Sequence, residues 1–196
     1  MWIDELAGVM PPPAAHERGA PATPQDWARA EAGLGHAIPA DFRAFVDRWG
    51  PGRIGDFLGL DTPAPGYHPV MTLPGSALSE ARAYDKLREH HPASHPWPVF
   101  PQPGSFLAFG TTDNGDHLGW IVDEGDPGNW PVAVVDDEYS TREVFEDLRF
   151  GPFLLELVTG RLRPRAFPDD LWDSLPLSFT PLAASDRFDE GRQDGD

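Results

Sequence analysis

Cysteine is absent from the 196-residue chain. Its absence excludes disulfides, thiolate metal sites, haem attachment and a cysteine nucleophile. Long apolar runs are missing too, because no run approaches the ~20 residues that a membrane-spanning helix needs. The first residues have neither the basic region nor the long apolar stretch of a signal peptide. We therefore expect a cytoplasmic protein that does not enter a membrane.

Basic residues are scarce as well. The chain has 15 Lys and Arg against 32 Asp and Glu, which gives a formal net charge of −17, and Lys86 is its single lysine. Nucleic acids and anionic membranes are bound through basic surfaces, so this charge disfavours both kinds of partner. It favours instead a basic protein that the negative field of the chain attracts during association.

Proline and glycine are abundant, with 23 and 20 residues, which predicts many loops and short regular elements. Seven Trp and twelve Phe supply bulky side chains for a core, and the length fits a single domain. We expect residues 1–22 to form an N-terminal arm and proline-rich linker, and residues 23–182 the folded domain. Residues 183–196 are expected to form an acidic, disordered tail.

Three helices are predicted in the first half of the chain. The first follows Thr23, whose hydroxyl can cap it, and ends at Gly35. The second follows Pro39, and its apolar residues recur at i, i+3, i+4 and i+7, namely Phe42, Phe45, Val46 and Trp49. The third covers about 76–90 and stops before Pro92. The short apolar segment 54–60 is expected to be an edge strand.

Strand patterns dominate from residue 106 onward. Segments 106–110, 117–123 and 131–136 are predicted to be antiparallel neighbours, because Asn114-Gly115 between the first two is a strong hairpin signal. Ser140 and Glu143 form a capping-box pattern, which predicts a helix through residues 144–148. A further helix is expected at 153–158. Helices, then an antiparallel meander, then helices indicate an α+β fold with helices packed on a central antiparallel sheet.

Four segments in this order resemble the SUKH superfamily, which contains bacterial toxin-immunity proteins and fungal cell-wall regulators. Residues 30–54, AEAGLGHAIPADFRAFVDRWGPGRI, resemble its opening pair of helices with aromatic anchors. Residues 106–123, FLAFGTTDNGDHLGWIVD, resemble its central hairpin, and residues 129–138, NWPVAVVDDE, resemble the next strand. Residues 153–164, FLLELVTGRLRP, resemble its closing helix. The resemblance extends from about Thr23 to Pro168. The proline-rich insert at 62–69, the N-terminal arm and the acidic tail depart from the pattern.

The resemblance implies a SUKH-like α+β fold with a central antiparallel sheet and no catalytic activity. We expect no cofactor. Members that resemble this chain are commonly immunity proteins that bind and block a cognate toxin, and their targets include nucleases. A regulatory scaffold that recruits other proteins, as the fungal relatives do, is an alternative function.

One stretch of the sequence predicts where a partner binds. From Glu89 to Thr141 there are nine acidic residues and no Lys or Arg. Like charges cluster in this way mainly on an exposed surface, so the stretch indicates either an ordinary solvated face or a negative face for a basic partner. A toxin with a basic substrate groove fits the second interpretation. The residues expected to bind it are Asp113, Asp116, Asp123, Glu124 and Asp126, with Trp97 in a proline-flanked loop as a partly exposed anchor.

The same hairpin allows a metal-site hypothesis. Asp113, Asp116, His117 and Asp123 could bind a hard cation such as Mg²⁺ or Ca²⁺, which would suit a metal-dependent hydrolase. However, Asp-Asn-Gly-Asp is also the pattern of a tight turn, because Asp and Asn side chains bond their own backbone and Asn-Gly accepts positive φ. The spacing of an EF-hand is lacking. We therefore expect a turn and no metal.

Overall fold

Short helices and strands follow one another along the chain, as its proline and glycine content predicts. The computed structural model describes residues 1–64 and 72–182. Its elements in chain order are α1 (Trp2–Val9), α2 (Pro24–Leu34), α3 (Ala40–Trp49), β1 (Gly52–Ile54), β2 (Leu58–Leu60), α4 (Gly75–His90), β3 (Phe106–Thr112), β4 (His117–Ile121), η2 (Pro127–Asn129), β5 (Val132–Val135), β6 (Arg142–Phe145), α5 (Phe150–Val158), η3 (Asp169–Asp173) and β7 (Phe179–Pro181). The expected tail at 183–196 and most of the insert at 62–69 lie outside the described residues. Within the described part of the chain, no helix is long and apolar enough to cross a membrane.

The centre of the fold is a seven-stranded sheet with the order β6-β5-β4-β3-β2-β1-β7. Every neighbouring pair of strands is antiparallel, so the predicted α+β class is confirmed. β3 and β4 form the predicted hairpin, in which Phe106 lies opposite Ile121 and Thr111 opposite His117. Gly115 in its turn has a φ of 91°, a conformation that glycine adopts without strain.

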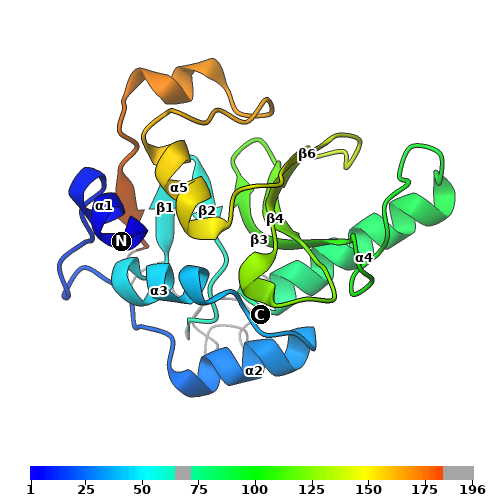
Figure 1. Ribbon diagram of the computed structural model, residues 1–196, viewed down its shortest axis with the longest axis horizontal. Helices are drawn as coiled ribbons and strands as arrows, with labels where there is room; N and C mark the ends of the chain where they lie inside the picture. The colour runs from blue at the N-terminus through cyan, green and yellow to red at the C-terminus, as the bar shows by residue number, and fades with distance from the viewer. Residues whose placement is uncertain (65–71, 183–196) are drawn as a thin grey trace, which may run out of the picture.

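Helices pack on both faces of the sheet (Figure 1). Successive side chains of a strand point to opposite faces, and β5 shows the division clearly. Val132 and Val134 belong to the large core that includes α2, α3 and α5. Val135 packs instead with Tyr84 of α4 in a second, smaller cluster. We call these two sides of the sheet the core face and the α4 face.

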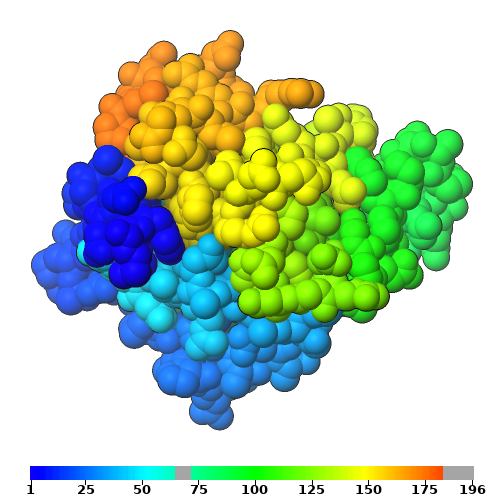
Figure 2. Space-filling view, viewed as in Figure 1, coloured from blue at the N-terminus to red at the C-terminus, as the bar shows by residue number. Residues whose placement is uncertain are grey.

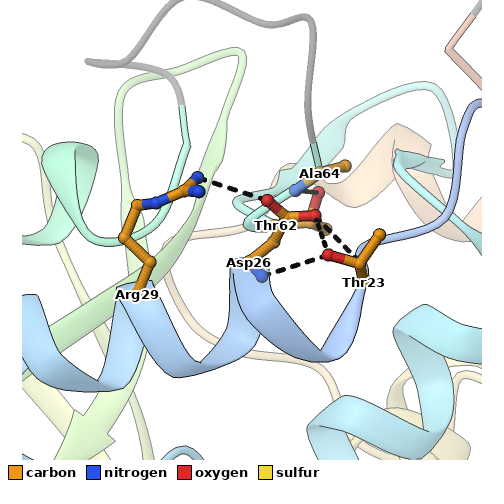
Figure 3. A network of polar contacts seen from close by, with 5 residues as sticks. All are labelled: Thr23, Asp26, Arg29, Thr62 and Ala64. Carbon is orange, nitrogen blue, oxygen red and sulfur yellow. Dashed lines mark hydrogen bonds and ion pairs between the residues drawn. The ribbon is translucent and has the colours of Figure 1, made fainter.

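α2 begins as the sequence predicts. The Asp26 N–H donates to Thr23 Oγ1 at 3.2 Å, and the Thr23 N–H donates to the Asp26 carboxylate at 2.9 Å (Figure 3). This reciprocal capping box satisfies N–H groups that have no partner inside the helix. The bonds from Thr23 also lower the pKa of Asp26. Arg29 reaches back to the same carboxylate at 3.2 Å.

α3 places the aromatic centre of the core face. Phe42 and Phe45 are fully buried, which confirms the predicted apolar side of this helix. The Phe42 ring lies 4.9 Å from that of Phe150 in α5 and 5.2 Å from that of Trp120 in β4. Phe45 stacks on Trp49 with ring centres 4.9 Å apart. These edge and stacked contacts add to the free energy of burial.

The N-terminal residues contribute to this core. Leu6 of α1 and Met10 after it are almost completely buried, and Trp49 Nε1–H donates to the Met10 carbonyl at 3.2 Å. The Trp2 ring lies directly against Gly151 of α5. Figure 2 shows the blue N-terminal residues packed beside the yellow residues of α5 and the cyan residues of α3. The arm expected at residues 1–22 therefore adds side chains to the core.

The strand expected at 54–60 is wrong in its extent and its position. β1 and β2 are two strands, joined by a turn at Gly55 and Asp56, which both have positive φ. Each has a neighbour on both sides in the sheet, so neither is an edge strand. Gly55 and Asp56 lie between two short apolar segments, and their turn conformation lets the chain reverse direction there.

The helix expected after Ser140 is also wrong. Residues 142–145 form strand β6, which pairs with β5 at the edge of the sheet. Ser140 closes the turn of this hairpin, because its N–H donates to Asp136 Oδ1 at 2.6 Å. Glu143 bonds the N–H of Arg165 at 2.8 Å instead of the start of a helix. The β5–β6 pairing, which lies outside any local pattern, decides the conformation.

Candidate partner-binding site

The structure separates the predicted acidic residues into two groups. Asp113 and Asp116 lie in the β3–β4 turn, whereas Asp123, Glu124 and Asp126 follow the other end of β4. At about 3.3 Å per residue of strand, the two groups lie roughly 20 Å apart. They do not form one continuous face along the hairpin.

The two turn residues differ in what they offer a partner. Asp113 is exposed and forms an ion pair with Arg53 of β1. Asp116 is only 6% exposed, and its carboxylate accepts the Thr112 hydroxyl at 3.1 Å while its N–H donates to Thr112 Oγ1 at 3.0 Å. Asp116 therefore holds the turn together, as the turn interpretation of this motif predicted.

The second group is exposed and shaped by its own backbone bonds. Asp123 accepts the N–H of Glu124 at 2.8 Å, and its carbonyl accepts Trp130 Nε1–H at 3.1 Å. Asp126 accepts the N–H of Gly128 at 3.0 Å and caps η2. These carboxylates remain free to meet a partner on their outer sides.

Trp97 is half-buried on the α4 face. Its ring stacks on Tyr84 with centres 6.0 Å apart, and the Arg142 guanidinium lies 4.6 Å from the ring centre. Its N–H donates to the Tyr84 hydroxyl at 2.9 Å, and that hydroxyl donates back to the Trp97 carbonyl at 3.2 Å. Trp97 is thus fixed in place, with part of its surface accessible.

The four residues of the metal-site hypothesis do not lie together. Asp123 lies at the opposite end of β4 from Asp113, Asp116 and His117, so the four proposed ligands do not converge. Across residues 1–64 and 72–182, no group of three His, Asp or Glu side chains is placed to hold a metal ion. The described residues therefore do not provide the metal site that a metal-dependent hydrolase would need.

A compact acidic group forms instead where β4 begins and β5 ends. The register places His117 opposite Val135, which brings the turn at 113–116 beside Asp136 and Asp137. Burial raises the pKa of Asp116, and the charges of Asp137 and Asp136 raise it further. Asp137 and the neighbouring Glu138 are exposed. We call Asp113, Asp136, Asp137 and Glu138 the acidic end.

The sequence contained the signal for this group, since residues 136–138 belong to the run without cations. What it lacked was the strand register that joins them to the hairpin turn. Asp136 stabilises the turn before β6, because its carboxylate accepts hydrogen bonds from Ser140. The bonds from Ser140 and Thr141 lower the pKa of Asp136, although burial opposes this. Asp137 and Glu138 are the two members with no such bond in the described part of the chain.

A buried polar chain extends from the acidic end under α4. Glu80 of α4 accepts the Tyr139 hydroxyl and lies 3.5 Å from His117 Nε2, and the His117 and Tyr139 rings stack 5.0 Å apart. His117 is 8% exposed, and its Nδ1 has no hydrogen-bond partner among the described residues. Burial lowers the pKa of His117, although Glu80 and Asp116 oppose this. Burial and the Glu80 carboxylate raise the pKa of Tyr139.

Asp61, directly after β2, belongs to the same region. Burial raises its pKa to about 7, the neighbouring charge of Glu80 adds to the rise, and the Ser76 hydroxyl opposes it. The α4 face therefore carries several carboxylates in a partly dry environment, none of which has an Arg or Lys partner among the described contacts.

Comparison with known families identifies the chain. The SMI1 / KNR4 family (SUKH-1) matches residues 21–149, which is more than half of the chain. A comparison with curated proteins gives no significant match. The matched region runs from the start of α2 to the start of α5 and includes six of the seven strands. It agrees with the resemblance carried by residues 30–54 and 106–138, and the chain belongs to the SMI1 / KNR4 family (SUKH-1).

Proposed function

We propose that the chain is a non-catalytic, immunity-type binding protein that neutralises a cognate intracellular toxin. The family is consistent with an immunity-type or a regulatory role. The acidic end is the observation that favours a basic toxin, because Asp137 and Glu138 are exposed on a chain with a formal charge of −17. A nuclease, whose substrate groove must be basic, has the charge that this surface fits.

Exposed charges of this kind act mainly on association. Opposite charges on two partners steer their encounter, and the effect declines as salt screens it. They contribute little to folding, so they can be changed without unfolding the protein. The proposal therefore predicts an effect of the acidic end on the association rate with the toxin.

The chain offers a matched pair of double variants for this test. Asp137→Asn with Glu138→Gln neutralises two exposed charges at the acidic end. Glu124→Gln with Asp126→Asn neutralises two exposed charges at the far end of β4, and Asn keeps the capping acceptor of Asp126. Both variants have the same net charge. A difference between their association rates therefore depends on where the charges lie and not on the total charge of the protein.

The measurement is association kinetics with a candidate toxin encoded by a neighbouring gene, at low and at physiological salt. We expect the acidic-end variant to associate about three- to tenfold more slowly at low salt, and the difference to shrink with added salt. Equal slowing of both variants would assign the effect to net charge. Failure of the wild-type chain to bind or protect against that toxin would refute the immunity role and leave the regulatory scaffold.

A further inference from the structure

Tyr139 has a backbone conformation that a bulky residue does not favour. It follows Glu138 of the acidic end directly, and its φ is 55°. Among the described residues, Asp56 is the one other residue besides glycine with a positive φ. Aspartate adopts this left-handed conformation several times more often than an average residue, whereas a large side chain there is an outlier. Such strain persists only where surrounding contacts hold the residue in place.

The contacts that hold Tyr139 are made by its ring and its hydroxyl. The ring stacks on that of His117 with centres 5.0 Å apart and packs against that of Tyr84 at 5.6 Å. The hydroxyl donates to Glu80 Oε2. Because Tyr139 is only 6% exposed, these neighbours enclose almost the whole side chain. The ring contacts therefore oppose the preference of the backbone for a negative φ.

This strained residue closes the turn that carries the exposed carboxylates. The Tyr139 N–H donates to the Asp136 carbonyl at 3.0 Å, so Asp137 and Glu138 take the two middle positions of a four-residue turn. The next N–H, that of Ser140, donates to Asp136 Oδ1 at 2.6 Å. A change of backbone conformation at Tyr139 therefore moves Asp137 and Glu138.

His117 is the member of this cluster whose hydrogen bonds depend on its proton. It is 8% exposed, its Nε2 lies 3.5 Å from Glu80 Oε2, and its Nδ1 has no partner among the described residues. The carboxylate favours the neutral ring with its N–H on Nε2, which leaves Nδ1 without a proton. Protonation adds a second N–H at Nδ1, and a buried donor without an acceptor is costly. The observed geometry suits the neutral ring better than the charged one.

The charges around His117 act in opposite directions. The titratable groups that face it are Glu80 from α4, Asp116 from the β3–β4 turn, and Asp137 and Tyr139 from the β5–β6 turn. Its strand neighbours in β3 and β5 are not titratable. Burial lowers the pKa of His117, although the three carboxylates oppose this. The folded protein therefore binds this proton less readily than the unfolded chain, so acid favours a rearrangement that exposes or repartners the ring.

We propose that His117 is a proton switch that controls the shape of the acidic end through Tyr139. With a neutral ring, the stacked pair holds the strained turn. With a charged ring, Nδ1–H turns toward an acceptor, the stack opens, and Tyr139 relaxes to a negative φ, which displaces Asp137 and Glu138. Weaker toxin binding in acid is the consequence, and this consequence rests on the proposed function. The rearrangement itself does not.

The rearrangement can be tested on the protein alone. Histidine Cε1–H signals and backbone amide signals are followed by NMR from about pH 8 to about pH 5, across the ordinary range of histidine titration. Asp136 keeps its charge in this range, because hydrogen bonds lower its pKa. We expect His117 to titrate below the usual histidine value of about 6.5, and the amide signals of Asp137 and Glu138 to change with the same midpoint. Exchange of the Ser140 amide, corrected for its intrinsic rate, should become about tenfold faster below that midpoint.

Variants then locate the group that responds. His117→Phe assigns the His117 signal and keeps an aromatic ring beside Tyr139 that cannot take up a proton, so the pH response of the turn should disappear. His91→Phe is the matched control, because it removes an exposed histidine at the end of α4. Asp61→Asn removes a carboxyl near Glu80 whose pKa is raised to about 7. Both of these variants should leave the response of the turn in place.

The outcomes separate the switch from the proposed function. A response of Asp137 and Glu138 that persists in His117→Phe would overturn the switch, because another group would then cause it. Titration of His117 in the wild-type protein without any change at these two amides would also overturn it, and this observation needs no variant to fold. Toxin binding through Asp137 and Glu138 would still support the function in either case. A responsive turn in a protein that binds no toxin would keep the switch and refute the function.

Discussion

Gly151 is the position where the packing of α1 can be tested most directly. It is the second residue of α5, and a Cβ built there would lie 2.6 Å from two atoms of the Trp2 ring and 3.0 Å from a third. Carbon atoms do not approach so closely, so Gly151→Ala must displace the indole. Overpacking of this kind costs about 1–3 kcal/mol, and the better helix propensity of Ala returns at most about 1 kcal/mol. We expect a net loss of about 1–2 kcal/mol.

Gly8 supplies the matched control, because it is an exposed helical glycine of α1 with nothing within 4 Å of a Cβ. Gly8→Ala should therefore stabilise the protein by about 0.5–1 kcal/mol. In a Trp2→Ala background the obstacle to Gly151→Ala is gone, and the substitution should become neutral or slightly stabilising. The double-mutant cycle should give a coupling of about 1–3 kcal/mol.

Urea denaturation followed by far-UV circular dichroism measures all four variants, since it does not depend on the fluorescence of Trp2. Contact between the Trp2 ring and Gly151 is refuted if Gly151→Ala stabilises the protein as much as Gly8→Ala does. That result would mean that α1 does not rest on α5 in solution. Leu6 and Met10 would then lose their place in the core.

Two further predictions concern a buried ring and a buried carboxyl. Phe45→Ala removes a side chain with 0% exposure, so urea denaturation should show a loss of about 3–5 kcal/mol, and a loss below about 1 kcal/mol would contradict the assigned helix face. The pKa of Asp61 is raised to about 7 in the folded protein. Between about pH 4 and pH 7 the folded state therefore keeps a proton that the unfolded state releases. The free energy of unfolding falls as the pH rises through this range. Asp61→Asn should therefore stabilise the protein by about 2–4 kcal/mol at pH 8 and hardly at pH 4, as denaturation midpoints at both pH values would show. An equal effect at both pH values would place Asp61 in contact with water.

Elements with complete local signals were predicted well. Thr23 and Asp26 form the capping box that starts α2, and both groups of that motif lie within four residues. Phe42 and Phe45 repeat at helical spacing, and both are buried. Asn114-Gly115 fixes the β3–β4 hairpin because positive φ is needed in the turn itself. In each case the residues that carry the signal lie within a few positions of one another in the sequence.

Elements decided by distant contacts were predicted poorly. Ser140 and Glu143 have the spacing of a capping box, but β5 needs a strand partner and the segment pairs with it. Ser140 bonds Asp136 and Glu143 bonds Arg165, which are contacts that no helical pattern shows. A local motif of two residues gains about 1 kcal/mol, and pairing along a whole strand outweighs it.

The charge of the candidate site could be predicted from the sequence, but the grouping of its residues in space could not. Composition revealed the surplus of negative charge, and the run without cations marked the right part of the chain. Strand geometry then separated Asp113 from Asp123 and joined Asp113 to Asp137, and the fold added Glu80 from α4. Register between strands and the position of a helix over a sheet follow from tertiary packing, which the charge pattern does not contain.

The two faces of the sheet differ in the side chains that they bury. The core face is closed by aromatic contacts around Phe42 and contributes the apolar burial that folding needs. The α4 face instead buries Glu80, His117 and Tyr139 together, although well-packed apolar side chains at such positions are often as stabilising or more so. Folding alone does not require this polar chain.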